Sequence, residues 1–410
     1  MSFLTSRDGT LASARAIASP DGIPFMYNSG DNTTVPSNET KITASDAAAS
    51  DEFGYAVAVG SGRVVVGARY DDDAGNASGS AYIFDLEGNQ IAKITASDAA
   101  DGDQFGTSVA AGSGKIVVGA YGNDDAGGAS GSAYIYDLSG TQLAKITASD
   151  AAAGDVFGFA VAVGSGRIVV GARGDDDNGS ASGSAYIFDL NGNEITKITA
   201  SDGAASDVFG YSVAVGSGRI VVGATDDGGS GSAYIFDLNG NEITKITASD
   251  IAAGDDFGWS VAVGCGRIVV GAKWDDDGGS NSGSAYIFDL EGTQLAKITA
   301  SDAPAANDLY GNSVAVGNGR IVVGVPFDDD VPSSSGSAYI YDLSGTQLAK
   351  ITTSDAADGD TFGFGVAVGC GRVVVGAHLS DDTGSSSGSA YIFDTPNVIT
   401  PYDVRDWEYG

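Results

Sequence analysis

Aspartate runs recur along the chain, and they are the side chains whose type and spacing could bind a metal ion. In each repeat, a run of two or three aspartates follows a short apolar segment within a few residues. Carboxylate oxygens are the ligands that calcium prefers in proteins. The four runs of three are therefore the candidate calcium ligands of this sequence: Asp71, Asp72, Asp73, Asp175, Asp176, Asp177, Asp275, Asp276, Asp277, Asp328, Asp329 and Asp330.

The same runs also suit a structural role. Asp, Gly, Ser and Asn residues cap backbone N–H groups in exposed turns, and solvent and salt make their like charges tolerable. Consecutive aspartates point in different directions, so three in a row cannot all reach one ion. Both interpretations stay open from sequence, with calcium as the candidate cofactor.

Aromatic side chains accompany these runs. A ligand-facing set beside the runs comprises Tyr70, Tyr121, Trp274 and Phe327, and a second set follows Phe-Gly dipeptides at Tyr55, Phe159, Tyr211, Trp259 and Phe364. Aromatic faces beside carboxylates can stack on sugars and hydrogen-bond to them. The alternative is that the second set packs between structural units and the first covers loop backbone.

Enzyme chemistry finds little support in the sequence. The single histidine, His378, lies in a variable loop. Catalysis normally needs different chemical groups that converge on one point, whereas near-identical units place the same groups around a ring. The two cysteines, Cys265 and Cys370, indicate free thiols. Arg173-Gly174-Asp175 spells an integrin-ligand tripeptide, but the equivalent residues 69–71 read Arg-Tyr-Asp, which favours coincidence. We predict a protein that is not an enzyme and has no catalytic residues.

The net charge limits the classes of partner that this protein can bind. With 54 acidic and 20 basic residues, the formal charge is −34, which argues against binding to nucleic acid phosphates. The apolar runs are too short to span a bilayer, so no membrane insertion is expected. The first residues lack the pattern of a secretory signal.

Internal repetition determines the fold prediction. The string Lys-Ile-Thr begins at Lys41, Lys93, Lys145, Lys197, Lys245, Lys297 and Lys350, so the intervals are 52, 52, 52, 48, 52 and 53 residues. A period near 50 built from short strands is typical of a propeller. One repeat holds four strand-like segments, at 55–59, 63–68, 80–85 and 90–95, with glycine-containing turns between the first two and the last two. We predict an all-β, seven-bladed β-propeller of four-stranded antiparallel blades over residues 41–394.

The two ends of the array complete each other. The first unit begins with the outermost strand of a blade, near Lys41, whereas the last ends at 389–394 without one. Pairing of these segments would close the ring and leave no bare sheet edge. In such a meander the aspartate loops share one face of the disc, and the hairpins that carry Arg63 and its equivalents lie on the other.

Phe-Gly dipeptides, each followed about a dozen residues later by Val-Gly-Ala, recur in this sequence. The pattern resembles the FG-GAP repeat of the seven-bladed propellers of integrin α subunits and of many bacterial and phage-encoded proteins. The resemblance implies a closed propeller and an adhesion role. The family's calcium loop, an Asp-x-Asp-x-Asp-Gly run in the hairpin between the first two strands, is missing here. Calcium is therefore not carried over from the family.

Two segments flank the propeller: an irregular N-terminal arm at 1–40 and a C-terminal tail at 395–410. We expect the arm to anchor the disc to other structural proteins of a large assembly, most simply a phage virion (tail or capsid appendage). The disc would then contact a host surface or neighbouring subunits. The alternative is a bacterial extracellular or cell-surface adhesin that binds a glycan or protein. The expected location is thus the virion or the extracellular space, and the arm residues best suited to anchoring are Phe3, Leu4, Ile17, Ile23, Phe25, Met26 and Tyr27.

Overall fold

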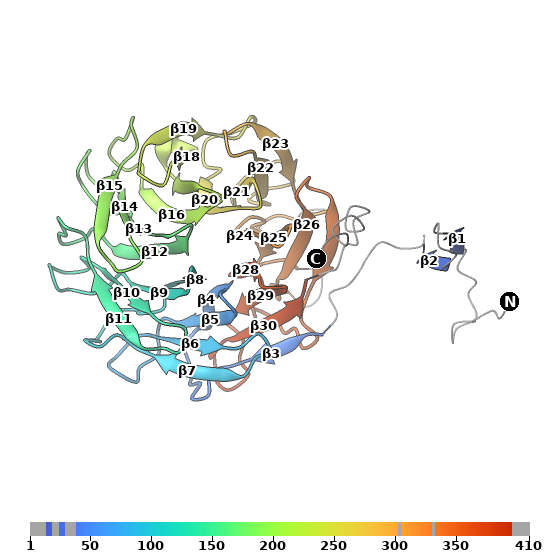
Figure 1. Cartoon of the computed structure of the whole chain (residues 1–410), viewed down its shortest axis with the longest axis horizontal. Helices are drawn as coiled ribbons and strands as arrows, with labels where there is room; N and C mark the ends of the chain where they lie inside the picture. Colours follow the sequence, from blue (N-terminus) through green and yellow to red (C-terminus); the bar gives the residue numbers. More distant parts are fainter. Residues whose placement is uncertain (1–13, 19–23, 29–37, 302–304, 330–332, 396–410) are drawn as a thin grey trace, which may run out of the picture. The chain divides into compact units, whose positions relative to one another are not determined.

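The computed structural model describes residues 14–18, 24–28, 38–301, 305–329 and 333–395. Within these ranges, seven four-stranded antiparallel sheets stand around a central axis as the blades of a propeller (Figure 1). Their only helical element is the short 3₁₀ turn η1 (Asp227–Gly229). The predicted all-β, seven-bladed fold is confirmed.

Each blade is a simple meander whose strands follow one another in the chain. Blade one contains β4 (Phe53–Gly60), β5 (Arg63–Ala68), β6 (Ser80–Phe84) and β7 (Gln90–Ile94); blade two β8 (Ser108–Gly112), β9 (Lys115–Ala120), β10 (Ser132–Tyr136) and β11 (Gln142–Ile146); blade three β12 (Phe157–Gly164), β13 (Arg167–Ala172), β14 (Ser184–Phe188) and β15 (Glu194–Ile198). Blade four contains β16 (Phe209–Gly216), β17 (Arg219–Ala224), β18 (Ser232–Phe236) and β19 (Glu242–Ile246); blade five β20 (Phe257–Gly264), β21 (Arg267–Ala272), β22 (Ser284–Phe288) and β23 (Gln294–Ile298); blade six β24 (Ser313–Gly317), β25 (Arg320–Val325), β26 (Ser337–Asp342) and β27 (Gln347–Ile351). Blade seven contains β28 (Val366–Gly369), β29 (Arg372–Ala377), β30 (Ser389–Asp394) and, from the other end of the array, β3 (Thr40–Ile42).

Blade seven closes the ring as predicted. Strand β3 pairs antiparallel with β30, and Lys41 lies opposite Tyr391. Ile42 is 4% exposed and packs in the core between blades seven and one. The closure is therefore a non-covalent latch that joins two segments far apart in the sequence.

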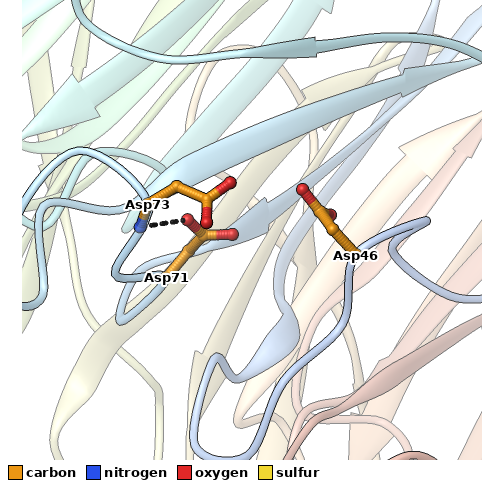
Figure 2. Close-up of side chains that lie close together, drawn as sticks. All are labelled: Asp46, Asp71 and Asp73. Atoms are coloured by element: carbon orange, nitrogen blue, oxygen red, sulfur yellow. Dashed lines mark hydrogen bonds between the residues drawn. The ribbon is translucent and has the colours of Figure 1, made fainter.

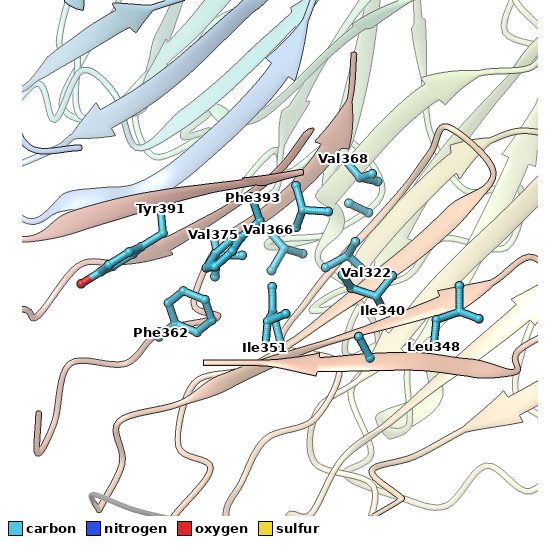
Figure 3. Packing of buried hydrophobic residues seen from close by; sticks show 14 of the residues in the cluster. Val322, Ile340, Leu348, Ile351, Phe362, Val366, Val368, Val375, Tyr391 and Phe393 are labelled. Carbon is cyan, nitrogen blue, oxygen red and sulfur yellow. The ribbon is translucent and has the colours of Figure 1, made fainter. Parts of the chain in front are cut away.

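Apolar cores fill the spaces between adjacent blades. In blade one, Val64 and Val66 face blade seven, whereas Val65 faces blade two, so the second strand is buried on both faces. The core between blades six and seven repeats this arrangement with Val322 and Phe393 among its members (Figure 3). This double burial explains why the second strand of each repeat is a continuous apolar run.

The Phe-Gly dipeptide joins neighbouring blades. The buried Phe53 ring packs edge-on against Tyr82, with 5.4 Å between ring centroids. Gly54 has φ +95°, and a Cβ there would stand 2.2 Å from the Ser389 carbonyl oxygen of the preceding blade. Only glycine fits this close approach. The motif recurs because every blade interface needs the same contact.

The contact pattern separates the propeller, residues 36–395, from a second unit. That unit contains an antiparallel hairpin of β1 (Ala14–Ala18) and β2 (Pro24–Asn28), in which Ile17 lies opposite Phe25. The N-terminal segment is thus not wholly irregular. Its sequence carries one corresponding signal, the Asp21-Gly22 dipeptide, which is typical of a hairpin turn. Among the predicted anchor residues, Ile17, Phe25, Met26 and Tyr27 belong to this hairpin, and Phe3, Leu4 and Ile23 lie outside the described residues.

Candidate functional site

A lysine ammonium stands among the aspartates of each acidic loop cluster. In blade one, Lys93 Nζ lies 2.7 Å from Asp46 Oδ2 and 2.9 Å from Asp71 Oδ2, and it also contacts Asp73. Figure 2 shows the three aspartates, which come from two separate loops. The Tyr82 hydroxyl hydrogen-bonds to both Asp46 and Asp71, at 2.8 Å each. The lysine thus holds the position that a bound cation would take.

Strand pairing puts the lysine there. Lys93 of β7 lies opposite Tyr82 of β6, and its Nζ is 5.4 Å from the centre of the tyrosine ring. Burial alone would lower the pKa of Lys93, but hydrogen bonds to Asp46, Asp73 and Asp71 outweigh it and raise the pKa above its usual value. Conversely, hydrogen bonds from Lys93 and Tyr82 outweigh burial and lower the pKa of Asp46. Both partners are therefore charged at neutral pH.

Every blade repeats this arrangement with its own lysine, which is the lysine of Lys-Ile-Thr. The pairs are Lys41 with Asp355 and Asp382, Lys93 with Asp46, Asp71 and Asp73, Lys145 with Asp98, Asn123 and Asp125, Lys197 with Asp150, Asp175 and Asp177, Lys245 with Asp202 and Asp227, Lys297 with Asp250, Asp275 and Asp277, and Lys350 with Asp328. Asp330 lies outside the described residues. Sequence reasoning missed the role of these lysines, although the recurrence of Lys-Ile-Thr was visible.

The middle aspartate of each run has a different task. Asp72 Oδ1 accepts a hydrogen bond from the Ala77 backbone N–H at 2.7 Å, and Ala77 adopts a positive φ of 50°. Asp176, Asp276 and Asp329 likewise accept a hydrogen bond from the backbone N–H five positions later. Neighbouring aspartates of a run thus serve different partners, as their side-chain directions require.

Two clusters have the carboxylate spacing that a metal ion needs. Oxygens of Asp46, Asp71 and Asp73 lie within 4.8 Å of one another, as do those of the cluster around Asp175. These acidic clusters could hold a metal ion, but calcium needs six to eight oxygen ligands. The lysine ammonium already bonds to the same oxygens. With the lysine in place, the residues do not fit a calcium ion.

A further aspartate in each repeat, two residues before the Phe or Tyr, is buried. Asp51 is 5% exposed and accepts a hydrogen bond from the Ala48 backbone N–H at 2.7 Å. Burial raises the pKa of Asp51 to about 6, and the nearby charge of Asp71 adds to the rise. Burial likewise raises the pKa of Asp308 to about 6. These carboxyl groups cap the loop that enters each blade.

The aromatic residues predicted to face a ligand do not converge. Trp274 is 40% exposed, whereas Tyr70, Tyr121 and Phe327 are half-buried. Tyr121 donates a hydrogen bond from its hydroxyl to Gln104 Oε1 at 2.6 Å. The structure places these four rings on four different blades, at separate loops.

The second aromatic set does converge, on a cavity of about 310 Å³ at the central axis. All seven blades line this cavity, and five contribute the aromatic residue that follows Phe-Gly: Tyr55, Phe159, Tyr211, Trp259 and Phe364. A smaller cavity of about 210 Å³ is lined by valine and alanine side chains further along the same strands. We call the aromatic-lined cavity the channel mouth; it lies at the end of the axis nearer the aspartate loops.

Adjacent rings of the channel mouth also contact each other across blade boundaries. Ring centroids are 5.2 Å apart for Phe159 and Tyr211 and 4.5 Å apart for Tyr211 and Trp259. Tyr55 and Phe364 are 5.0 Å apart. The rings therefore pack between blades, as one of the two sequence interpretations expects, and they also border a cavity; binding of sugars to them stays a prediction.

Behind these rings, two positions 17 residues apart form a pair in each repeat, and we call these the rim pairs. One member precedes the Phe or Tyr of the dipeptide, and the other follows Gly-Ala or its equivalent. Glu52 forms an ion pair with Arg69 at 2.7 Å, and the Thr361 hydroxyl lies 3.0 Å from His378 Nδ1. The full set is Glu52 with Arg69, Gln104 with Tyr121, Val156 with Arg173, Val208 with Thr225, Asp256 with Lys273, Leu309 with Pro326 and Thr361 with His378.

His378 and the Arg-Gly-Asp tripeptide have structural surroundings. The His378 ring packs against Phe364 and Tyr55, and burial together with the charge of Arg69 lowers its pKa to about 3. Asp175 of the tripeptide is 4% exposed and bonds to Lys197 and Tyr186. Its carboxylate is not available in the way an exposed recognition tripeptide requires.

Together, the closed ring, the repeated blade contact and the channel define a repeat-built β-propeller with a structural or binding role. The model of the FG-GAP repeat matches residues 36–84, 89–136, 141–188, 193–236, 241–288, 293–341 and 346–393. The chain therefore belongs to the FG-GAP repeat family, whose propellers are typically non-catalytic. No curated protein gives a significant match to the sequence. In the part of the chain that the structure describes, no helix is long and apolar enough to cross a membrane.

Proposed function

We propose that this protein is a non-enzymatic structural and adhesion propeller carried by a large assembly, a phage virion in the first instance. Residues 1–40 attach it to other structural proteins of the particle, and the disc meets a host surface or neighbouring subunits. The observation that carries this proposal is the ring closure. Because β3 pairs with β30, the seventh blade has its full set of four strands, and the disc needs no partner to complete a sheet.

A closed disc has its blade interfaces satisfied internally, so attachment is best supplied by a segment outside it. The contact pattern separates such a segment from the propeller. The segment contains the hairpin of β1 and β2, in which Ile17 pairs with Phe25. An isolated two-stranded hairpin is only marginally stable in water and gains from packing against another surface.

The channel mouth favours the second candidate, a bacterial extracellular or cell-surface adhesin. Its aromatic lining and its half-exposed neighbour Trp274 are the kinds of group that bind glycans or protein side chains. Both candidates use the disc as the ligand-facing part. They differ in what residues 1–40 contact.

Particle sedimentation distinguishes the two. The full chain, a chain that starts at Pro36, and a fluorescent protein fused to residues 1–40 would be produced in cells that make the particle. We expect the full chain and the fusion to sediment with particles, and the shortened chain to stay behind as a folded monomer. Trp274→Ala, a change in the disc, is the control and should sediment normally. Incorporation of the shortened chain at normal copy number would contradict attachment through the arm.

A further inference from the structure

The aromatic residues of the channel mouth form two separate walls. Phe159, Tyr211 and Trp259 come from the consecutive blades three, four and five, whereas Tyr55 and Phe364 come from blades one and seven. In a closed ring of seven blades, blade four lies opposite the junction of blades seven and one, so the two walls face each other across the axis (Figure 1). Burial is the main cause of the raised pKa of Tyr211, and Tyr55 is near enough to add to it, which agrees with this placement. A flat ligand can therefore lie between two aromatic surfaces.

Polar side chains complete the lining of the channel mouth. Thr107 of blade two and Asn312 of blade six fill the two gaps between the walls. Asn312 donates a hydrogen bond from Nδ2 to the Phe364 carbonyl oxygen at 3.0 Å, and its Oδ1 accepts none from the residues that the structure describes. Within the same residues, the hydroxyl groups of Tyr55 and Tyr211 also have no hydrogen-bond partner, and none of these three groups is buried from solvent. All three are therefore available to a ligand in the cavity.

The charges around the channel mouth favour a neutral ligand. Two cations lie on its rings from outside the cavity lining: the Arg69 guanidinium carbon is 3.7 Å from the centre of the Tyr55 ring, and Lys273 Nζ is 2.8 Å from that of the Trp259 ring. A cationic ligand on the same rings would be repelled by them. An anionic ligand has no ion-pair partner, because no basic side chain of the described residues lines the cavity.

We propose that the channel mouth binds a neutral pyranose sugar, which lies between the two aromatic walls and hydrogen-bonds to Asn312, Tyr55 and Tyr211. The C–H face of a pyranose packs on aromatic rings, and its hydroxyl groups pair with the three polar groups. A cavity of about 310 Å³ lies at the small end of the range for ligand sites, which suits one sugar unit. An aromatic side chain of a protein would fill the space between the walls but pair with at most one of the polar groups. This inference rests on the proposed role of the disc as the ligand-facing part.

Binding of small probes to the full chain tests the proposal. Three neutral pyranosides, methyl β-glucoside, methyl β-galactoside and methyl α-mannoside, would be titrated by calorimetry. Methyl β-glucuronide, tetramethylammonium and p-cresol represent an anion, a cation and an aromatic side chain. We expect at least one neutral pyranoside to bind about tenfold or more tightly than each of these three. Failure of all three pyranosides to bind at millimolar concentrations would overturn the proposal, as would equal or tighter binding of any of the other probes.

Two substitutions with matched controls locate the site. Trp259→Ala should weaken binding of the best pyranoside about tenfold or more, whereas Trp274→Ala, outside the cavity lining, should leave it within about twofold. Tyr211→Phe keeps the ring and removes the hydroxyl, and should weaken binding about fivefold.

The control for Tyr211→Phe is Tyr121→Phe, because the Tyr121 hydroxyl bonds to Gln104 and the residue does not line the cavity. Melting temperatures of the four variants separate loss of the site from loss of the fold. Unchanged binding in both Trp259→Ala and Tyr211→Phe would overturn the proposal. The sedimentation result for residues 1–40 is independent of these outcomes, so failure of the sugar site leaves the proposed attachment standing.

Discussion

Lys197 and Lys273 are the same residue type in opposite surroundings. Lys197 bonds to Asp150, Asp175 and Asp177, and these hydrogen bonds outweigh burial and raise its pKa. Lys273 lies between the rings of Trp259 and Trp274, and burial lowers its pKa to about 8 despite the charge of Asp256. The ammonium of Lys197 is thus neutralised by bonded carboxylates, whereas Lys273, beside the channel-mouth ring of Trp259, has no bonded carboxylate among the residues that the structure describes.

The largest disruption of the acidic face removes the lysine of one cluster together with the strand that carries it. Deletion of residues 1–46 removes β3 and Lys41, the partner of Asp355 and Asp382, whereas deletion of residues 1–37 leaves them. Loss of the buried Ile42 side chain alone should cost about 1.5–3 kcal/mol. We expect the longer deletion to lower the melting temperature sharply and the shorter one to leave it nearly unchanged. Equal midpoints in thermal unfolding would contradict the latch.

Replacing Lys197 and Lys273 separately measures how much each ammonium contributes to the free energy of unfolding. Lys197→Met leaves the buried Asp175 carboxylate without its cation and should cost about 3 kcal/mol. Lys273→Met removes an ammonium that has no bonded carboxylate, and should change the free energy of unfolding by less than about 1 kcal/mol. Chemical denaturation of both variants provides the measurement. A larger loss for Lys273→Met would reverse our view of the two sites.

Calcium should stabilise a cluster that has lost its lysine and leave the intact cluster unaffected. In Lys197→Met the oxygens of Asp150, Asp175 and Asp177, which lie within 4.8 Å of one another, are released from the ammonium. Millimolar calcium should then raise the melting temperature of this variant by binding preferentially to the folded state. The parent protein should not respond, and magnesium controls for general screening. A calcium response in the parent would show that the lysine yields to the ion.

Lowering the pH has two opposite effects on the stability of the folded protein, and both arise at the acidic face. The pKa of Asp51 is raised to about 6 by burial, so the folded protein binds this proton more readily than the unfolded chain, and stability rises as pH falls from about 7 to 4. The pKa of Asp46 is lowered below its usual value, so its contribution to stability is lost as the pH falls further, below about 4. Melting temperature against pH should therefore pass through a maximum at mildly acidic pH. Asp51→Asn should flatten the upper part of the curve, and an unchanged slope there would contradict the assignment.

Most of the fold was predictable from the sequence because each blade is specified locally. Tight turns such as Ser61-Gly62, both at positive φ, recur in every unit, as does the Phe-Gly contact, with Tyr310-Gly311 in the sixth. The unmatched ends imply closure. The clusters were harder to predict, since Lys93 and Asp46 are 47 residues apart and belong to different units. Strand alternation shows that the lysine is half-exposed but not which loops it reaches. The rim pairs did carry a signal, because residue types change together at a constant spacing of 17, as in Glu52 with Arg69 and Gln104 with Tyr121.

The smallest expected effect is the titration of Lys273 itself. Its Nζ lies 2.8 Å from the centre of the Trp259 ring, so loss of the proton removes a cation from the indole face. With a pKa of about 8, set mainly by burial, this change falls well below the range of an ordinary lysine. Tryptophan fluorescence should therefore shift with a midpoint near pH 8 in the parent, and the shift should be missing in Lys273→Met. Lys197→Arg, which keeps the charge in an acidic cluster, is the matched control and should retain it. A midpoint above pH 10 in the parent would mean that a carboxylate stabilises this ammonium after all, and the contrast between the two sites would then disappear.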